Sequence, residues 1–215
     1  MLRQLSAEAL GTAFLLIGVV GSGIMAQTLS DGNIALALLA NAIATGCILY
    51  VIIETLGPIS GAHFNPAVTL YFTLRGEMTP GPAAAYMATQ ILAGILGVFA
   101  AHLMFDLPIW QFSTTDRTGP ALWASEMIAT FGLLFVIVGG LAARREAIPV
   151  LVALYITGAY WFTASTSFAN PAVTIARGFS DTFAGINPSH VPAYIGVQII
   201  AAIVGALTLP RLFRK

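Results

Sequence analysis

Charged residues are scarce in this chain of 215 amino acids. Nine lysines and arginines and nine aspartates and glutamates make up 8% of the sequence, whereas soluble proteins carry roughly 25%. A soluble enzyme could not cover its surface with polar groups at this composition, and a disordered segment would hold far fewer apolar residues than the 58% found here. The formal net charge of zero excludes the basic face that a nucleic-acid binder needs. These absences leave a polytopic α-helical membrane protein embedded in a lipid bilayer.

Cysteine is almost missing. Cys47 stands alone, so the chain can form no intrachain disulfide and no thiol-based metal cluster. We expect Cys47 to be a packing residue, and we predict neither a metal site nor a cofactor.

Long stretches of the chain contain no charged residue. Each can hold the about 20 apolar residues that a membrane-spanning helix needs. The first carries Glu8 and lacks a convincing cleavage site, so we interpret it as a span rather than a signal peptide. The alternation typical of membrane barrel strands is missing. We predict spans at residues 6–27, 34–56, 81–104, 121–143, 147–167 and 189–209.

Lysine and arginine are distributed unevenly about these six spans. If the segments carrying Arg75 and Arg177 re-enter the membrane from opposite sides, the side of the termini collects seven positive residues and the other side only Arg117 and Arg177. Because positive residues stay cytoplasmic, both termini are expected in the cytoplasm. The compact termini suggest a bacterial inner membrane. The seven residues are Arg3, Arg75, Arg144, Arg145, Arg211, Arg214 and Lys215.

The sequence also repeats itself in a preserved order. Each half holds three spans, an odd number, so the second copy must lie upside down relative to the first. Inverted repeats of this kind place the functional site at their interface near the bilayer midplane. The matching segments are 8–12 and 126–130, 62–70 and 167–175, and 86–97 and 194–205.

We therefore predict one domain, 1–215, made of two inverted repeats. The first repeat covers 1–105, the second covers 121–215, and residues 106–120 connect them.

Two short hydrophobic segments follow the second and fifth spans and cannot cross the membrane. The first runs about ten residues, which as a helix rises about 15 Å, half of the hydrocarbon thickness. Asparagine is a preferred helix N-cap and proline suits the first turn, so each segment is expected to begin a half-helix. The two motifs are Asn65-Pro66-Ala67 and Asn170-Pro171-Ala172.

Two half-helices entering from opposite faces would meet with Asn65 and Asn170 at the centre. Irregular backbone inside a membrane is tolerated where it is buried in protein or lines a watery cavity. The positive helix ends and the two amide groups would repel cations there and donate hydrogen bonds to a neutral solute. We predict a passive pore for small neutral solutes.

These motifs resemble those of the aquaporin, or major intrinsic protein, family over essentially the whole chain. The resemblance implies an all-α membrane fold of six tilted helices plus two re-entrant half-helices, and a homotetramer with one pore per subunit. It further implies structural support of the re-entrant loops by Glu8 and Glu126. Gln90 and Gln198 are expected to make similar bonds between helices, and His63 to line the cytoplasmic vestibule.

The chain departs from the family at the constriction called the selectivity filter. Most members carry an arginine three residues after the second motif asparagine, where this chain has Val173. The family's spacing assigns the other filter positions to Thr45, Gly158 and Ser167. This filter is small, nearly uncharged and wide. Arg177 is not a substitute on this interpretation, because it is expected to cap its half-helix at the periplasmic surface.

The filter and the stretch from 155 to 177 are similar to aquaporins of bacterial arsenic-resistance operons. That resemblance implies passage of arsenous acid, a neutral molecule whose shape and hydroxyl groups resemble those of a small polyol. An unselective pore for water, glycerol and urea remains the alternative. A proton-coupled transporter would need a coupling carboxylate in the path, for which only Glu8 and Glu126 are available. No serine lies in a recognisable nucleophile motif, so an intramembrane hydrolase is not supported.

Overall fold

The structure is a computed structural model that describes residues 1–213. Arg214 and Lys215, two members of the predicted cytoplasmic charge cluster, lie outside the described residues. Within those residues the chain is all α-helical and contains no strand, as predicted. The helices of the first half are α1 (Leu2–Leu29), α2 (Ile34–Ser60), α3 (Pro66–Leu74) and α4 (Pro80–Met104).

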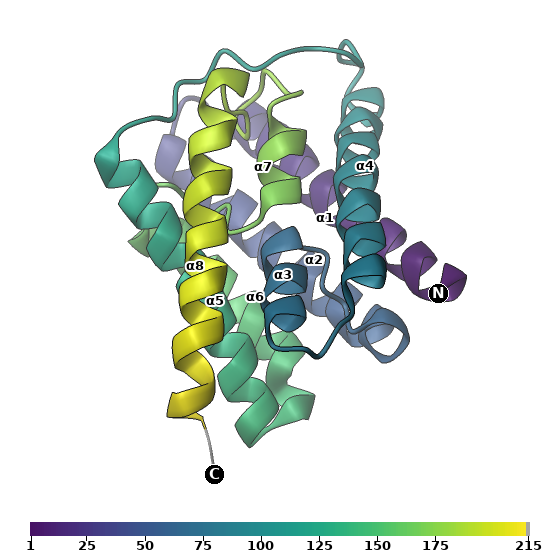
Figure 1. The fold of residues 1–215 in the computed structure, drawn as a ribbon. Helices are drawn as coiled ribbons and strands as arrows, with labels where there is room; N and C mark the ends of the chain where they lie inside the picture. The colour runs from purple at the N-terminus through teal and green to yellow at the C-terminus, as the bar shows by residue number, and fades with distance from the viewer. Residues whose placement is uncertain (214–215) are drawn as a thin grey trace.

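The second half repeats this order with two added 3-10 turns (Figure 1). Its helices α5, α6 and α8 correspond to α1, α2 and α4, and its half-helix α7 corresponds to α3. The elements are α5 (Pro120–Ala143), a 3-10 turn (Arg145–Ala147), α6 (Ile148–Phe162), α7 (Pro171–Arg177), a second 3-10 turn (Pro188–His190) and α8 (Val191–Leu212).

Helix α6 is shorter than the sequence predicts. Five of the described helices are long and apolar enough to cross a membrane, namely α1, α2, α4, α5 and the segment Pro188–Leu212. The sixth, α6, has 15 residues and ends at Phe162, whereas we expected a span over 147–167. At 1.5 Å per residue it rises about 22 Å. The predicted span is wrong at its end because residues 163–170 turn back toward the centre as the loop before α7.

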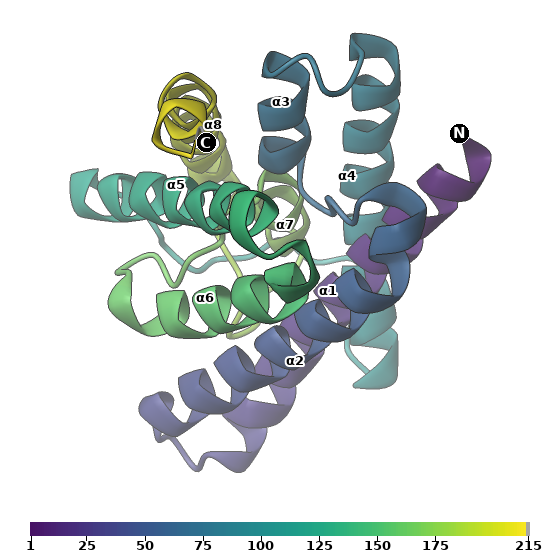
Figure 2. The same ribbon diagram turned by 90° about the horizontal axis from the view of Figure 1, so that it is seen from below.

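The two halves interlock through their half-helices. Helix α1 packs against α2 and α4, and α5 packs against α6 and α8. Each half-helix contacts the last helix of the opposite half more extensively than that of its own half, since α3 packs on α8 and α7 packs on α4. Figure 1 shows α7 and α3 one below the other between α8 and α4, and Figure 2 shows α7 near the centre with the other helices around it.

A small residue makes the packing of α1 on α4 possible. A Cβ atom at Gly97 would overlap the carbonyl oxygen of Ala13 and lie 3.0 Å from the Cα atom of the same residue. Only glycine therefore lets the two backbones approach this closely, as is common between membrane helices.

The outward faces of the long helices are strongly apolar. Large hydrophobic side chains such as Leu39, Leu96, Leu154 and Leu207 are exposed. The most deeply buried side chains include polar ones, among them Glu8. A surface of this kind suits hydrocarbon rather than water.

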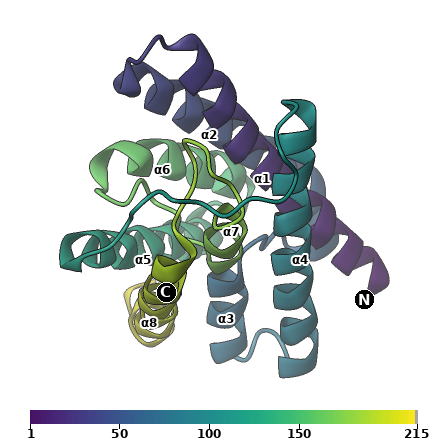
Figure 3. The ribbon, with the colours of Figure 1, turned by 90° about the horizontal axis from the view of Figure 1, so that it is seen from above.

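The connection between α4 and α5 crosses the face where α7 ends (Figure 3). The backbone N–H of Ser113 donates to the carbonyl oxygen of Gly178 (3.0 Å), and that of Asn187 donates to Thr115 (2.8 Å). The connection is thereby tied to the segment between α7 and α8.

Candidate functional site

Asn65 and Asn170 begin the two half-helices and also join them. Each residue has an extended backbone and its side-chain oxygen accepts the N–H of the second following residue, at 2.8 Å for Ala67 and 2.9 Å for Ala172. The Nδ2 atom of Asn65 donates across the interface to the carbonyl oxygen of Ala169 (2.7 Å). The structure therefore brings the two motifs together, and each amide both caps its own helix and binds the other half.

The loops before the two asparagines share an uncommon backbone conformation. Ala62 and Phe64 have φ angles of +50° and +47°, and the equivalent residues Ser167 and Ala169 have +51° and +49°. A left-handed conformation is costly for residues other than glycine and persists only where the surroundings enforce it. The repetition of this pattern indicates that the same constraint acts in both halves.

In the first half the constraint comes from Glu8 of α1, whose side chain is fully buried. Its carboxylate accepts the backbone N–H groups of His63 (3.0 Å) and Phe64 (2.7 Å). It also accepts the hydroxyl group of Ser60 (2.6 Å) and the amide of Gln90 (2.7 Å). Because a buried carboxylate needs compensating donors, these four bonds hold the loop in place.

In the second half Glu126 of α5 does the same. Its carboxylate accepts the backbone N–H groups of Phe168 (3.2 Å) and Ala169, and the amide of Gln198 (2.9 Å). Gln198 also donates to the hydroxyl group of Thr174 (2.9 Å), which links the loop to α7. The structure therefore places Glu8, Glu126, Gln90 and Gln198 around the two loops, where the resemblance implied structural support.

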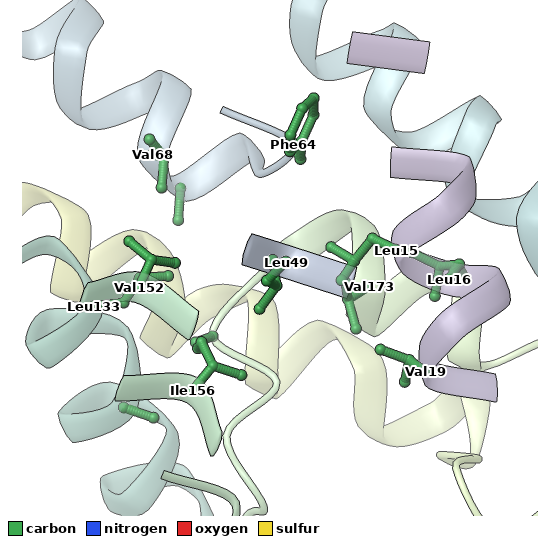
Figure 4. Close-up of a cluster of buried hydrophobic side chains, with 14 of the residues drawn as sticks. Leu15, Leu16, Val19, Leu49, Phe64, Val68, Leu133, Val152, Ile156 and Val173 are labelled. Carbon is green, nitrogen blue, oxygen red and sulfur yellow. The ribbon is translucent and has the colours of Figure 1, made fainter. Parts of the chain in front are cut away.

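A cavity of about 400 Å³ runs beside the two asparagines, and both line it. Its wall is mostly aliphatic and draws on α1, α2, α3, α5, α6 and α7. Figure 4 shows several of these side chains around the central space. The aliphatic residues that line the cavity and are labelled there are Leu15, Val19, Leu49, Val68, Leu133, Val152, Ile156 and Val173.

Three of the four expected filter residues, Thr45, Ser167 and Val173, lie on this cavity. Gly158 is not among the lining residues, whereas Tyr160 of the same helix, α6, is one of them. The hydroxyl groups of Tyr160 and Thr45 are 3.2 Å apart and hydrogen-bonded. Family spacing missed Tyr160, although it is a buried polar side chain two residues beyond Gly158.

The expectation for Arg177 is wrong. Its side chain is only 3% exposed and lines the cavity, whereas we expected it at the membrane surface. The guanidinium carbon lies 3.4 Å from the centre of the Phe168 ring, and Nε donates to the carbonyl oxygen of Ala184. The spacing of four residues from Val173 is the signal that could have placed Arg177 on the same helix face.

The other end of the cavity carries His63, with Glu77 and Arg145 in the lining. The His63 ring stacks on Phe72, with ring centres 4.9 Å apart, and its Nδ1 atom lies 3.1 Å from the hydroxyl oxygen of Thr69. His63 therefore lines the cavity, and its position on the cytoplasmic side stays a prediction. Within residues 1–213 no cluster of three or more His, Cys, Asp and Glu residues is placed to hold a metal ion.

Comparisons with known proteins agree with this geometry. The model of the family described as Major intrinsic protein matches residues 1–164. The chain is 55% identical over 209 residues to "Aquaglyceroporin AqpS" of Rhizobium meliloti (strain 1021), covering 97% of this chain and 89% of that one. It is 32% identical over 217 residues to "Nodulin-26" of Glycine max, covering 96% of this chain and 74% of that one.

A solved structure shares the fold. The X-ray structure of the aquaglyceroporin from Plasmodium falciparum superposes with a TM-score of 0.75 and covers 99% of this chain and 95% of that one. The sequence identity is 19%, so this likeness concerns the arrangement of the helices.

Proposed function

Because the chain belongs to the major intrinsic protein family, we propose that it conducts arsenous acid and neutral solutes of glycerol size by passive diffusion along the cavity beside Asn65 and Asn170. Members of this family are channels and not enzymes, and the chain is a multi-pass membrane protein of the aquaglyceroporin type for small solutes. The finer assignment to arsenous acid is the proposal.

The composition of the cavity supports passage of neutral rather than charged molecules. The aliphatic wall offers no compensation for the hydration shell that an ion would lose. Polar groups occur at a few points, including the amides of Asn65 and Asn170 and the hydroxyl of Ser167. A solute with several hydroxyl groups can exchange its water contacts for these groups in sequence.

The observation that carries the proposal is the uncharged wall at Thr45, Ser167 and Val173, together with the small size of the first two side chains. Arsenous acid is neutral at pH 7 and presents hydroxyl groups like a small polyol. A wall that admits glycerol on these grounds also admits arsenous acid. The similarity to an aquaglyceroporin at 55% identity supports a solute larger than water.

The test is to reconstitute the protein in liposomes and to measure permeability to water, glycerol, urea and arsenous acid side by side. We expect rapid, non-saturating flux of glycerol and arsenous acid that does not depend on a pH gradient. Flux of glycerol without arsenous acid would overturn the assignment and leave the general water, glycerol and urea channel. Saturating flux that requires a proton gradient would instead favour a coupled transporter.

We also propose a homotetramer with both termini in the cytoplasm of a bacterial inner membrane. The excess of arginine and lysine on the side of the termini supports this orientation. Native mass spectrometry of the detergent-solubilised protein should give four subunits. A C-terminal fluorescent fusion should be bright, whereas an alkaline phosphatase fusion at the same place should be inactive.

A further inference from the structure

The end of α7 carries a buried arginine on the same helix face as Val173. Arg177 follows Val173 by four residues, which places it about 6 Å farther along the helix axis on the same side. Both residues line the cavity, and only 3% of the Arg177 surface is exposed. A positive charge therefore borders the path one helical turn away from the uncharged Val173.

The guanidinium group of Arg177 is held in one place. Its central carbon lies 3.4 Å from the centre of the Phe168 ring, and its Nε donates to the carbonyl oxygen of Ala184. Phe168 is fixed in turn, because its N–H donates to the carboxylate of Glu126 and its ring packs against Tyr194. The cation is thus anchored to the same network that holds the re-entrant loop.

A second guanidinium group lies close to the same ring. The central carbon of Arg117, from the connection between α4 and α5, lies 5.3 Å from the ring centre of Phe168. Its Nε donates to the carbonyl oxygen of Gly185 (2.8 Å). The ion pairs among residues 1–213 involve Arg144 and His190 and neither of these two arginines. No carboxylate among these residues therefore neutralises the charge of either arginine. Because the protein interior has a lower dielectric constant than water, this charge repels nearby cations more strongly than it would in water.

The Arg177 side chain keeps hydrogen-bond donors that the described part of the protein does not use. Of the Arg177 side-chain nitrogens, the hydrogen bonds within residues 1–213 engage only Nε, and this side chain lines the cavity. The hydroxyl group of Ser167, a residue only 3% exposed, has no partner in the described part of the chain and lines the same cavity. A buried hydroxyl without a partner is costly, so Ser167 is an unsatisfied polar residue in the same cavity lining as Arg177.

We propose that Arg177, supported by Phe168 and Arg117, is a specificity-determining residue that excludes cations at this end of the cavity and donates hydrogen bonds to the oxygen atoms of neutral solutes. The positive charge of Arg177 lies one helical turn away from position 173, where most family members carry their arginine. The small Val173 side chain can therefore leave room for solutes while Arg177 repels cations. This inference rests on the proposed function as a channel for neutral solutes.

The test compares Arg177→Gln with the wild-type protein in the same liposomes. Potassium conductance is measured with a voltage-sensitive dye, and glycerol flux by light scattering. We expect Arg177→Gln to raise potassium conductance about tenfold or more while glycerol still permeates, because the fixed charge is lost and the path is kept.

Arg177→Lys, which keeps the charge, should conduct potassium as little as the wild-type protein. Arg144→Gln, which removes an exposed arginine in the turn after α5, is the matched control and should change neither quantity.

The outcomes separate this inference from the proposed function. Wild-type liposomes without glycerol or arsenous acid flux would overturn the proposed function. Glycerol flux in Arg177→Gln together with the potassium conductance of the wild-type protein would overturn only the role of Arg177.

A chemical test on folded protein decides the question if Arg177→Gln does not fold. 2,3-Butanedione modifies accessible arginine side chains and is added to liposomes that already contain the wild-type protein or Arg177→Lys. We expect the reagent to lower glycerol flux several-fold in the wild-type protein only, because the adduct on Arg177 would obstruct the path. An equal response of both proteins would overturn the proposal.

Discussion

Asn65 and Asn170 each donate a hydrogen bond from Nδ2 to the carbonyl oxygen of the residue that precedes the other asparagine. The distances are 2.7 Å from Asn65 to Ala169 and 2.8 Å from Asn170 to Phe64. Each amide therefore stabilises the opposite loop while its oxygen caps its own half-helix. The junction of the two half-helices depends on this exchange, and a change on one side should be felt on both.

Removing either asparagine side chain should destabilise the protein by more than the loss of a helix cap. Asn170→Ala removes the cap of α7 and leaves the buried carbonyl oxygen of Phe64 without its donor, which together cost about 2–4 kcal/mol. Asn65→Ala should cost a similar amount. Asn33→Ala is the matched control, because Asn33 caps α2 at an exposed site, and it should cost only about 1 kcal/mol. Unfolding in detergent measures all three, and equal losses would contradict the exchange.

Neutralising a buried glutamate should weaken the loop that it holds. Glu126→Gln replaces one acceptor oxygen by a donor that faces the N–H groups of Phe168 and Ala169, at a cost of about 2–3 kcal/mol. Glu8→Gln should behave alike. Glu54→Gln, at an exposed site of α2, should change stability by less than about 0.5 kcal/mol. Thermal unfolding of the three variants gives the comparison, and an unaffected Glu126→Gln would argue against a supporting role.

An arginine at position 173 should narrow the path. The side chain of Val173 lines the cavity beside Asn170, so Val173→Arg adds bulk and a second charge next to Arg177. We expect glycerol and arsenous acid flux to fall about tenfold, which corresponds to about 1.4 kcal/mol in the barrier. Val173→Ala should not reduce flux. Unchanged flux in Val173→Arg would mean that this side chain does not border the path.

The packing of α1 on α4 should not tolerate a methyl group at Gly97. Gly97→Ala places its Cβ atom against the backbone of Ala13 and should destabilise the protein by about 1–3 kcal/mol. Gly81→Ala lies in the same helix with open space around it and should be nearly neutral. Thermal unfolding of the two variants tests the difference, and equal stability would contradict the close approach of the two helices.

The half-helices and their meeting point were predictable because local chemistry defines them. An asparagine followed by proline caps a helix in any surroundings, and a segment of about ten apolar residues is too short to span a membrane. The repetition of the motif then places the two copies at one interface. The observed starts of α3 at Pro66 and α7 at Pro171 follow from these local preferences.

The details of the cavity wall were less predictable because tertiary contacts decide them. Spacing borrowed from a family assumes a common helix register, and of the two α6 residues Tyr160 lines the cavity whereas Gly158 is not in the lining. An arginine in a charge-poor membrane chain suggests a surface anchor. Arg177 is buried instead, because its guanidinium group lies against the Phe168 ring and donates to the carbonyl group of Ala184. Both partners belong to segments whose position no local pattern gives.

The most direct test of the account asks whether solutes travel through the cavity at all. Ser167→Cys places a thiol in the cavity wall, and glycerol flux is recorded from the same liposomes before and after a small neutral methanethiosulfonate reagent is added. The wild-type protein retains exposed Cys47 and serves as the control. We predict that the reagent reduces flux in Ser167→Cys to the level of empty liposomes, that a reducing agent restores it, and that the wild-type protein is unaffected. Full glycerol flux through quantitatively labelled Ser167→Cys would contradict the account.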